Sequence, residues 1–515
     1  MPRARYILHS TPRLADIDLR LIRRTIIETL NTSIQQVHRH SSSRSGVYIG
    51  TGGTILMDWR LAHQDDELAI QSMSELYTHP LTRSPSGSNS SFLETSIGAA
   101  TLILIHQYRL ERLEQNKRGT HHSNLNRSSS NSSSSSATHS RQHRLSRKNT
   151  EAGIHLIRHA IQVSVDEPIE DDGCEVLYGR AGLLYALLRI RSELSSSILT
   201  EDPIASSIDN LCSDENINTL VNDIVERGKL GSQQYARELQ DENERRRIPP
   251  LMWSWHGKRY LGAAHGVAGI LQILICTPPE IIAPHWDLVA NTARWLVDIQ
   301  LPDGNWPTKA VRNMFNAQDE NEDTQLVQWC HGAPGLLIFL SSLLRRYRQY
   351  HSPSTLALPH DLMTSTRNAI MRGGELIYKR GLLRKGVGLC HGIGGNVYAL
   401  LSVSDALDNG NGYGVGTGED SLTIHDTRIS VWLYRAVHLA QLATAYDNLT
   451  QRGQMNTPDR PYSLYEGLGG MCCAWAEIVR RLDRVMGKDG GGNGAREDMG
   501  IGHGLPGFDD LRILD

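Results

Sequence analysis

Two short stretches of the chain place a cysteine and a histidine side by side, each directly before a glycine. They are QWCHGAPGLL, around Cys330, and GLCHGIGGNV, around Cys390. Thiolate and imidazole ligands suit Zn²⁺, and a catalytic zinc has three protein ligands with one position left open. Cys330, Cys390 and His391 would supply such a set. The alternatives are two separate metal sites, a closed site that also uses His331, and small core residues that bind nothing.

A glycine pair of the form Gly-x-x-Gly follows both stretches and recurs along the chain. Seven copies, one of them degenerate, each precede an apolar run: GTGG at 50–53, TSIG at 95–98, GRAG at 179–182, GVAG at 266–269, GAPG at 332–335, GIGG at 392–395 and GLGG at 467–470. One copy is weak evidence, but seven that each open an apolar segment indicate a structural repeat. The pattern predicts a turn that needs glycine for backbone freedom and close approach, followed by a helix buried on most sides.

Amphipathic segments lie between these copies, for example at 286–300 and 428–446, where apolar residues recur at helical spacing. Each repeat is therefore expected to hold one outer amphipathic helix and one inner apolar helix. An open concave face would be wet, so inner helices with little polar surface favour closure into a ring. The expected fold is all-α, a seven-fold α/α toroid, with an open solenoid as the alternative. Residues directly before each Gly-x-x-Gly would then converge at one end of the ring.

The composition bounds the class of protein. The 515 residues include 21% charged residues, a formal net charge of −3 and seven cysteines. A near-neutral balance gives no case for a nucleic-acid partner. An odd number of scattered cysteines fits a reducing compartment, so we expect a cytoplasmic protein. No apolar run reaches the roughly 18 residues that a transmembrane helix requires. Whether the chain contacts the plasma membrane peripherally is left open by the sequence.

Three parts of the chain differ in composition. Residues 1–45 are expected to form an N-terminal helix or extension, 46–485 the ring, and 486–515 a Gly-rich tail without regular structure. Within the ring, a Ser-rich and basic segment at about 115–150 has few apolar residues and, from Asn116 onwards, no Asp or Glu. Such a segment cannot bury enough surface to offset its ordering entropy, so we expect a disordered insertion.

Several of these stretches are similar to the LanC-like family, the eukaryotic relatives of the bacterial lanthipeptide cyclase lanthionine synthetase C. The similarity is carried by QWCHGAPG, GLCHGIGGNVYALL, WHGKRYLGAAHGVAGI and LYGRAGLLYALL, and by TPDRPYSLYEGLGG near the end of the chain. It extends over roughly residues 49–481, interrupted by the Ser-rich segment. The resemblance implies an α/α toroid with one zinc ion held by Cys330, Cys390 and His391. It also places His265, in AAHG, at the family's catalytic general acid/base.

The resemblance also implies a reaction. Bacterial members activate a cysteine thiol that adds to a dehydrated Ser or Thr. Eukaryotic members resemble glutathione-binding enzymes that add the glutathione thiol to dehydroamino acids in peptides or proteins. A zinc-bound thiol is deprotonated, whereas a free thiol with a pKa of about 8.5 is mostly protonated at neutral pH. His265 would then return a proton to the enolate that forms on addition. We therefore expect a zinc-dependent, thioether-forming enzyme that resembles a glutathione transferase.

This chain departs from the family pattern at several positions. The bacterial cyclases carry an Asp before the third Gly-x-x-Gly and an Arg before the WC motif, whereas here only Glu175 is a loose substitute for the Asp. This pattern is shared with the eukaryotic branch; it argues against peptide cyclisation and leaves thiol activation intact. For glutathione, the family's Lys before the CHG motif corresponds to Lys385, and an N-terminal Arg corresponds to Arg5. A further Arg is replaced by Asn456, for which Arg460 would compensate.

Two other functions stay open at this point. The chain could be a non-catalytic scaffold or signalling module that binds zinc and glutathione. It could also be another α/α toroid enzyme, such as a carbohydrate-active hydrolase. That reaction needs two carboxylates flanking the bond, and we expect Glu466 to stand alone among the acidic residues at the ring end. The sequence therefore favours the thiol-transfer enzyme.

Overall fold

The computed structural model describes residues 4–13, 16–40, 42, 44–61, 67–79, 81, 85–121, 136–170, 172–194, 203–310, 325–349, 356–408, 421–424, 427–487 and 503–511. Regular structure in these residues is helical apart from one antiparallel hairpin, in which β1 (Ser421–Ile424) pairs with β2 (Thr427–Ser430). Within the same residues, no helix combines the length and hydrophobicity that a membrane crossing requires.

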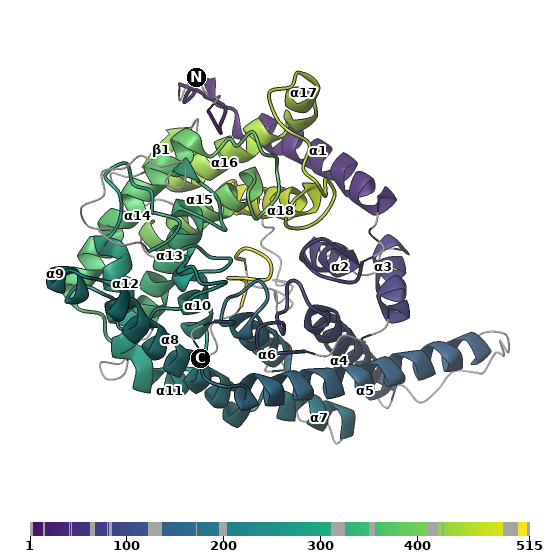
Figure 1. Cartoon of the computed structure of the whole chain (residues 1–515). Coiled ribbons are helices and arrows are strands. Elements are labelled where there is room, and N and C mark those ends of the chain that lie inside the picture. Colours follow the sequence, from purple (N-terminus) through teal and green to yellow (C-terminus); the bar gives the residue numbers. More distant parts are fainter. Residues whose placement is uncertain are drawn as a thin grey trace.

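In the described part of the chain, seven inner helices surround the centre of a ring and seven outer helices enclose them (Figure 1). The inner helices are α2 (Thr51–Arg60), α4 (Ser96–His121), α6 (Arg180–Leu194), α10 (Val267–Leu274), α13 (Ala333–Gln349), α15 (Ile393–Leu407) and α18 (Leu468–Val485). The outer helices are α1 (Leu19–Arg39), α3 (Glu67–Thr78), α5 (Ser136–Asp166), α8 (Asp214–Glu238), α12 (Trp286–Asp298), α14 (His360–Arg380) and α16 (Val431–Ala443). Shorter connecting helices are α7 (Pro203–Leu211), α9 (Glu242–Arg245), α11 (Pro279–Ile282) and α17 (Tyr446–Gln451), with a 3₁₀ turn at Ala283–His285. The all-α toroid predicted from the sequence is confirmed.

The ring is closed in two ways. Each inner helix packs against the next one along the chain, and α18 returns to pack against α2. In addition, a backbone N–H before each inner helix donates to a carbonyl of the next repeat. The bonds run from Tyr48 to Leu93, Ser91 to Tyr178, Leu177 to Ala264, Ala263 to Trp329, Cys330 to Cys390, Cys390 to Tyr465, and Tyr465 back to Tyr48. An open solenoid would leave the last repeat without a partner, so that alternative is excluded.

The second glycine of each Gly-x-x-Gly permits close approach of two chain segments. In all seven copies, a Cβ built there would lie well under 3.0 Å from the carbonyl oxygen six residues earlier. Real Cβ atoms essentially never come this close to another heavy atom. Backbone freedom matters less than expected. The first glycine has an ordinary φ of −119° at Gly50 and −128° at Gly392, and Gly332 is the copy with a left-handed φ, of +92°. The repeat therefore requires glycine chiefly for space.

Helix α1, which lies within the residues expected as an N-terminal extension, is the outer helix that precedes α2. Its buried residues Ile22, Ile26, Leu30 and Val37 recur at helical spacing, and the helix packs against α18. Asp18 caps its N-terminus by accepting two backbone hydrogen bonds. The first outer helix thus lies over the last inner helix, which ties the two ends of the ring together.

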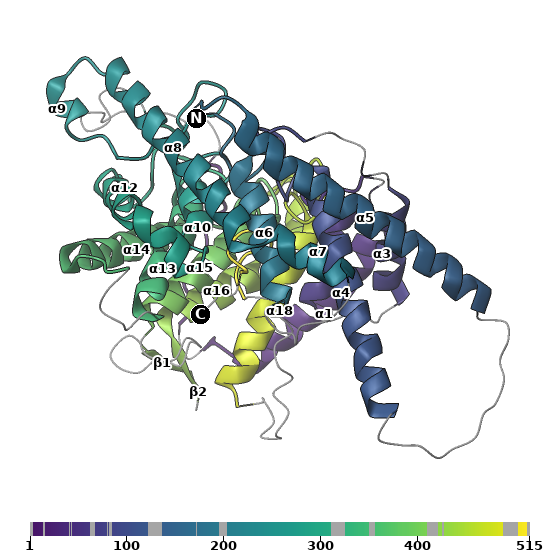
Figure 2. The same ribbon diagram turned by 90° about the horizontal axis from the view of Figure 1, so that it is seen from below.

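Two helices extend into the Ser-rich segment. Residues 116–121 continue α4 and residues 136–150 begin α5, so both stretches are helical where disorder was expected. Residues 122–135 lie outside the described part. Figure 1 and Figure 2 both show α5 projecting beyond the ring. A helix satisfies its interior backbone hydrogen bonds internally, so it can continue from a packed end into a polar sequence.

The C-terminal segment differs most from expectation. Residues 503–511, expected to belong to an unstructured tail, lie inside the ring, where the yellow trace crosses the centre of Figure 1. Leu505, Phe508 and Asp510 have no exposed surface. The prediction of an unstructured tail is wrong for these residues. Their apolar LPGF sequence packs inside the ring, although it directly follows a Gly-rich stretch that masks it in the sequence. Residues 488–502 and 512–515 lie outside the described residues.

Candidate functional site

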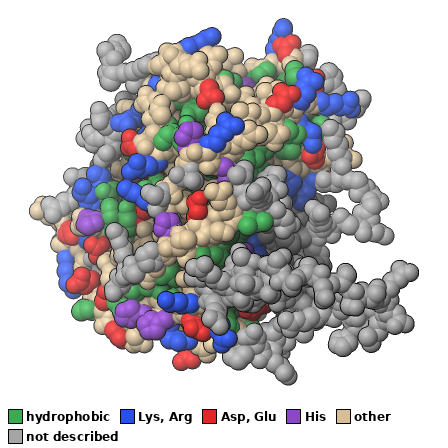
Figure 3. Space-filling model, turned by 90° about the vertical axis from the view of Figure 1, so that its right-hand side faces the viewer, with side chains coloured by type: hydrophobic (Ala, Val, Ile, Leu, Met, Phe, Trp, Pro, Cys, Tyr) green, Lys and Arg blue, Asp and Glu red, His purple; other side chains and the backbone are tan. Residues whose placement is uncertain are grey.

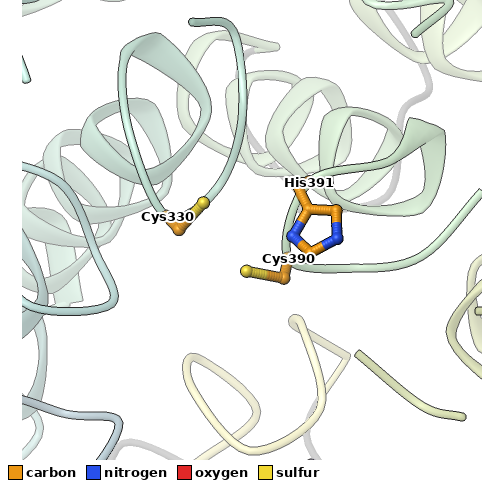
Figure 4. Close-up of side chains that lie close together, drawn as sticks. All are labelled: Cys330, Cys390 and His391. Carbon is orange, nitrogen blue, oxygen red and sulfur yellow. The ribbon is translucent and has the colours of Figure 1, made fainter. Parts of the chain in front are cut away.

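The loops before α13 and α15 bring three predicted ligands together (Figure 4). The Sγ atoms of Cys330 and Cys390 and one ring nitrogen of His391 all lie within 4.8 Å of one another. Both cysteines are buried, and His391 is partly exposed. The Cys330 N–H donates to the Cys390 carbonyl at 3.2 Å, so the two loops are also joined through their backbones.

This set contains ligand types that zinc prefers, at a spacing that could hold a metal ion. Sulfur ligands about 2.3 Å from a tetrahedral zinc lie roughly 3.8 Å apart, which is below the 4.8 Å within which the three ligand atoms lie here. Burial, and then the neighbouring Cys330 thiol, raise the pKa of the Cys390 thiol well above its ordinary value, while His391 opposes the rise. A divalent cation would relieve the electrostatic cost of ionising two adjacent buried thiols. Three ligands would leave one tetrahedral position for a further ligand.

His331 stands apart from this cluster. Among the described residues, the group with metal-ligand spacing consists of Cys330, Cys390 and His391. The ring of His331 lies beside Tyr260 instead, with 5.5 Å between the ring centroids. The geometry therefore favours a three-ligand set over a closed four-ligand site.

His265 lies before α10 and is held on two sides. Its Nδ1 is 3.0 Å from Oε2 of Glu175, and its ring stacks on Trp255 with 3.9 Å between centroids. The buried Glu175 carboxylate also accepts hydrogen bonds from the N–H groups of Leu177 and Tyr178, each at 2.7 Å. Because Nδ1 contacts Glu175, Nε2 is the nitrogen left for a substrate.

Glu175 is the acidic partner of His265. Burial raises the pKa of Glu175, and the hydrogen bond and charge of His265 oppose that rise, as do the two backbone donors. An ionised carboxylate here would stabilise a protonated imidazole. The sequence identifies Glu175 only as a loose substitute for the family's Asp. It does not predict the contact with His265, which lies 90 residues away in the chain. The available signal was an acidic residue four positions before GRAG.

The loop that carries His265 touches the loop that carries Cys330. A Cβ built at Gly262 would lie well under 3.0 Å from the Cys330 carbonyl oxygen. The Tyr260 ring lies 5.9 Å from His265 and 5.5 Å from His331, which follows Cys330 in the chain. His265 and the cysteine cluster therefore share one end of the ring.

Two acidic residues occupy matching places in other repeats. Glu466 directly precedes GLGG and Glu94 directly precedes TSIG, so Glu466 does not stand alone as expected. Burial, and then the charge of Glu466, raise the pKa of Glu94 to about 7, while Arg44 opposes the rise. The degenerate glycine pattern of the second repeat concealed Glu94. This pair removes one objection to a carbohydrate-active hydrolase, but that reaction has no use for the cysteine cluster.

The exposed cationic residues predicted to contact glutathione are Arg5, Lys385 and Arg460. Their segments meet beside the Cys390 loop. The Arg5 carbonyl accepts from the Arg384 N–H at 3.0 Å, which places the N-terminal segment next to Lys385. The Asn456 N–H donates to the Arg384 carbonyl at 2.6 Å, which brings the loop that carries Arg460 alongside. All three predicted residues are solvent-exposed. The structure thus gathers their backbone segments at one edge of the ring end.

Residues 41–483 match the family model described as lanthionine synthetase C-like protein. The chain is 29% identical over 311 residues to a protein from Danio rerio named glutathione S-transferase LANCL1, and this alignment covers 59% of each chain. It is 28% identical over 310 residues to LanC-like protein GCL1 from Arabidopsis thaliana, over 60% of this chain and 56% of that protein. The chain therefore spans less than two thirds of the length of either relative.

Proposed function

The chain belongs to the lanthionine synthetase C-like family, and from this premise we propose that it adds the thiol of glutathione to dehydroamino acids in peptides or proteins, with zinc as cofactor. The observation that carries the proposal is the Cys330–Cys390–His391 cluster at the same ring end as the Glu175–His265 pair. The Danio rerio relative is named a glutathione S-transferase, which supports glutathione as the thiol.

Cys330, Cys390 and His391 would hold the zinc ion. When bound, zinc lowers the pKa of a coordinated thiol so that the thiolate is present at neutral pH. A free thiol with a pKa of about 8.5 is roughly 97% protonated at pH 7. The cysteines are buried and the histidine is partly exposed, so a thiol would approach from the side of His391.

The addition itself needs one proton donor. The thiolate sulfur bonds to the β-carbon of a dehydroalanine or dehydrobutyrine residue, the carbon–carbon π bond breaks, and its electron pair forms an enolate. Nε2 of His265 would protonate the α-carbon, since Glu175 holds Nδ1 at 3.0 Å. The proton lost by the thiol balances the one delivered, so the reaction needs no oxidant or reductant.

Charge complementarity supports the proposed co-substrate. Glutathione carries two carboxylates, which Arg5, Lys385 and Arg460 would bind through charge-assisted hydrogen bonds. We place the activity in the cytoplasm because the seven cysteines are free thiols, as expected in a reducing compartment. On the face shown in Figure 3, basic and acidic side chains of the described residues are interspersed.

The test is a mass assay for the adduct. The zinc-loaded protein is incubated with glutathione and a dehydroalanine peptide, and the glutathione adduct should form faster than in buffer. Cys390→Ala should lose both zinc and activity, whereas Cys276→Ala, which removes another buried free thiol, should keep both. His265→Ala should keep zinc and react about 100-fold more slowly. Zinc-loaded protein that forms no adduct above background would support the non-catalytic alternative instead.

A further inference from the structure

The C-terminal segment inside the ring touches the residue that precedes the first cysteine. The Phe508 ring packs edge-on against Trp329, with 5.2 Å between centroids and 86° between the ring planes. Trp329 directly precedes Cys330 and has no exposed surface. The C-terminal segment therefore packs against the residue next to Cys330.

The same segment also holds the residue that supports the second cysteine. The Tyr465 hydroxyl donates to the Pro506 carbonyl at 2.7 Å. The Tyr465 carbonyl in turn accepts from the Cys390 N–H at 2.8 Å, and the Tyr465 ring lies 5.3 Å from Trp329. Each cysteine thus has one aromatic neighbour, Trp329 for Cys330 and Tyr465 for Cys390. The C-terminal segment contacts both aromatic residues.

We propose that residues 505–511 are a structural part of the metal centre. Phe508 and Pro506 are positioning residues that act through Trp329 and Tyr465 to hold the Cys330 and Cys390 loops at ligand spacing. This inference rests on the metal site of the proposed function. Removing the Phe508 ring would open a cavity that Trp329 can fill only by moving away from its present position.

Polar contacts hold the segment in place independently of Phe508. The Tyr185 hydroxyl donates to Oδ1 of Asp510 at 2.7 Å, and Nη2 of Arg345 lies 3.7 Å from Oδ2 of Asp509. Arg60 donates to the Gly504 carbonyl. These contacts remain when Phe508 is shortened. A Phe508 variant therefore tests the packing of the Phe508 ring against Trp329 and not the loss of the whole segment.

The test uses three variants of the full chain, each with one substitution. Phe508→Ala should weaken zinc binding at least tenfold in a chelator competition, and Phe508→Leu, which fills much of the same space, should recover most of that loss. His503→Ala is the control, because His503 lies before these residues and contacts Arg480 of α18 at 3.4 Å. We expect it to change zinc affinity less than twofold.

A second readout needs neither zinc nor glutathione. Hydrogen–deuterium exchange on a peptide spanning residues 388–395 reports the Cys390 N–H, which should exchange at least tenfold faster in Phe508→Ala than in the unmodified chain. Unchanged exchange and unchanged zinc affinity would overturn the inference. If exchange accelerates in a chain that forms no glutathione adduct, the inference stands and the proposed function falls.

A fourth variant decides the question if Phe508→Ala fails to fold. Tyr465→Phe removes only the hydroxyl that donates to Pro506 and keeps the ring and the backbone carbonyl. We expect it to weaken zinc binding a few-fold and to accelerate exchange at the Cys390 N–H. Exchange and zinc affinity equal to those of the unmodified chain would again overturn the inference.

Discussion

Replacing Glu175 with glutamine tests whether His265 depends on its carboxylate. Glutamine keeps the side-chain length and one acceptor oxygen. It removes the negative charge that faces Nδ1 of His265 at 3.0 Å. It also turns an NH₂ donor towards a site where the carboxylate now accepts hydrogen bonds from Leu177 and Tyr178. The imidazole should therefore lose both its orientation and the charge that stabilises its protonated form.

The expected loss follows from the burial of this pair. A hydrogen bond to a charged group contributes about 1.5–3 kcal/mol, and the His265 side chain is 14% exposed and that of Glu175 1%, so water screens little of it. A loss of about 2 kcal/mol in stabilising the protonated imidazole corresponds to roughly 30-fold slower adduct formation. Zinc binding should be retained, because the ligand set contains neither residue.

The assay is adduct formation in a single turnover, with zinc content measured on the same sample. Glu244→Gln is the matched control, since Glu244 is a buried carboxylate, 7% exposed, on α9. It should react within twofold of the unmodified rate. A Glu175→Gln rate within threefold of the unmodified rate, at full zinc content, would refute the coupling of the two residues.

Two further substitutions test the fold that positions the site. Gly395→Ala places a Cβ well under 3.0 Å from the Leu389 carbonyl, so we expect zinc binding to weaken and the melting temperature to fall by about 1–3 °C. Gly46→Ala, whose Cβ would meet only the Leu93 carbonyl at 3.8 Å, should leave both unchanged, and equal losses in the two variants would contradict the role of close approach. Burial raises the pKa of Asp509 to about 6 from an ordinary 3.8. The raised pKa of Asp509 therefore stabilises the folded chain fully below about pH 4. This contribution to the free energy of unfolding, up to roughly 3 kcal/mol, is lost as the pH rises through about 6. Asp509→Asn should remove that part of the pH dependence of the denaturant midpoint, and an unchanged slope would contradict the assignment.

The ring was predictable because its signal repeats. Seven glycine pairs with apolar runs encode seven inner helices, and the amphipathic segments between them encode the outer ones. Residues 503–511 were not predictable in the same way, since nothing in LPGF repeats and the stretch before it is Gly-rich. Their packing depends on tertiary partners such as Trp329 and Tyr465, which lie far away in the sequence.

The candidate site was predictable to the extent that it follows the repeat. Cys330 and Cys390 lie at equivalent positions of adjacent repeats, and His391 directly follows Cys390, so the packing of these two repeats brings the three residues together. Glu175 lies outside that position, three residues before Tyr178, and reaches His265 by a side-chain contact that no spacing rule predicts. Glu94 does lie at the equivalent position, but TSIG lacks the first glycine that would have marked it.

The central claim is that zinc would be held by two cysteines and one histidine, with one position left for the glutathione thiol. X-ray absorption at the zinc edge tests it directly on the zinc-loaded chain. We expect two sulfur ligands at about 2.3 Å and nitrogen or oxygen ligands at about 2.0–2.1 Å. Saturating glutathione should raise the sulfur count to three. A count that stays at two with glutathione present, or a zinc environment without sulfur, would contradict the claim.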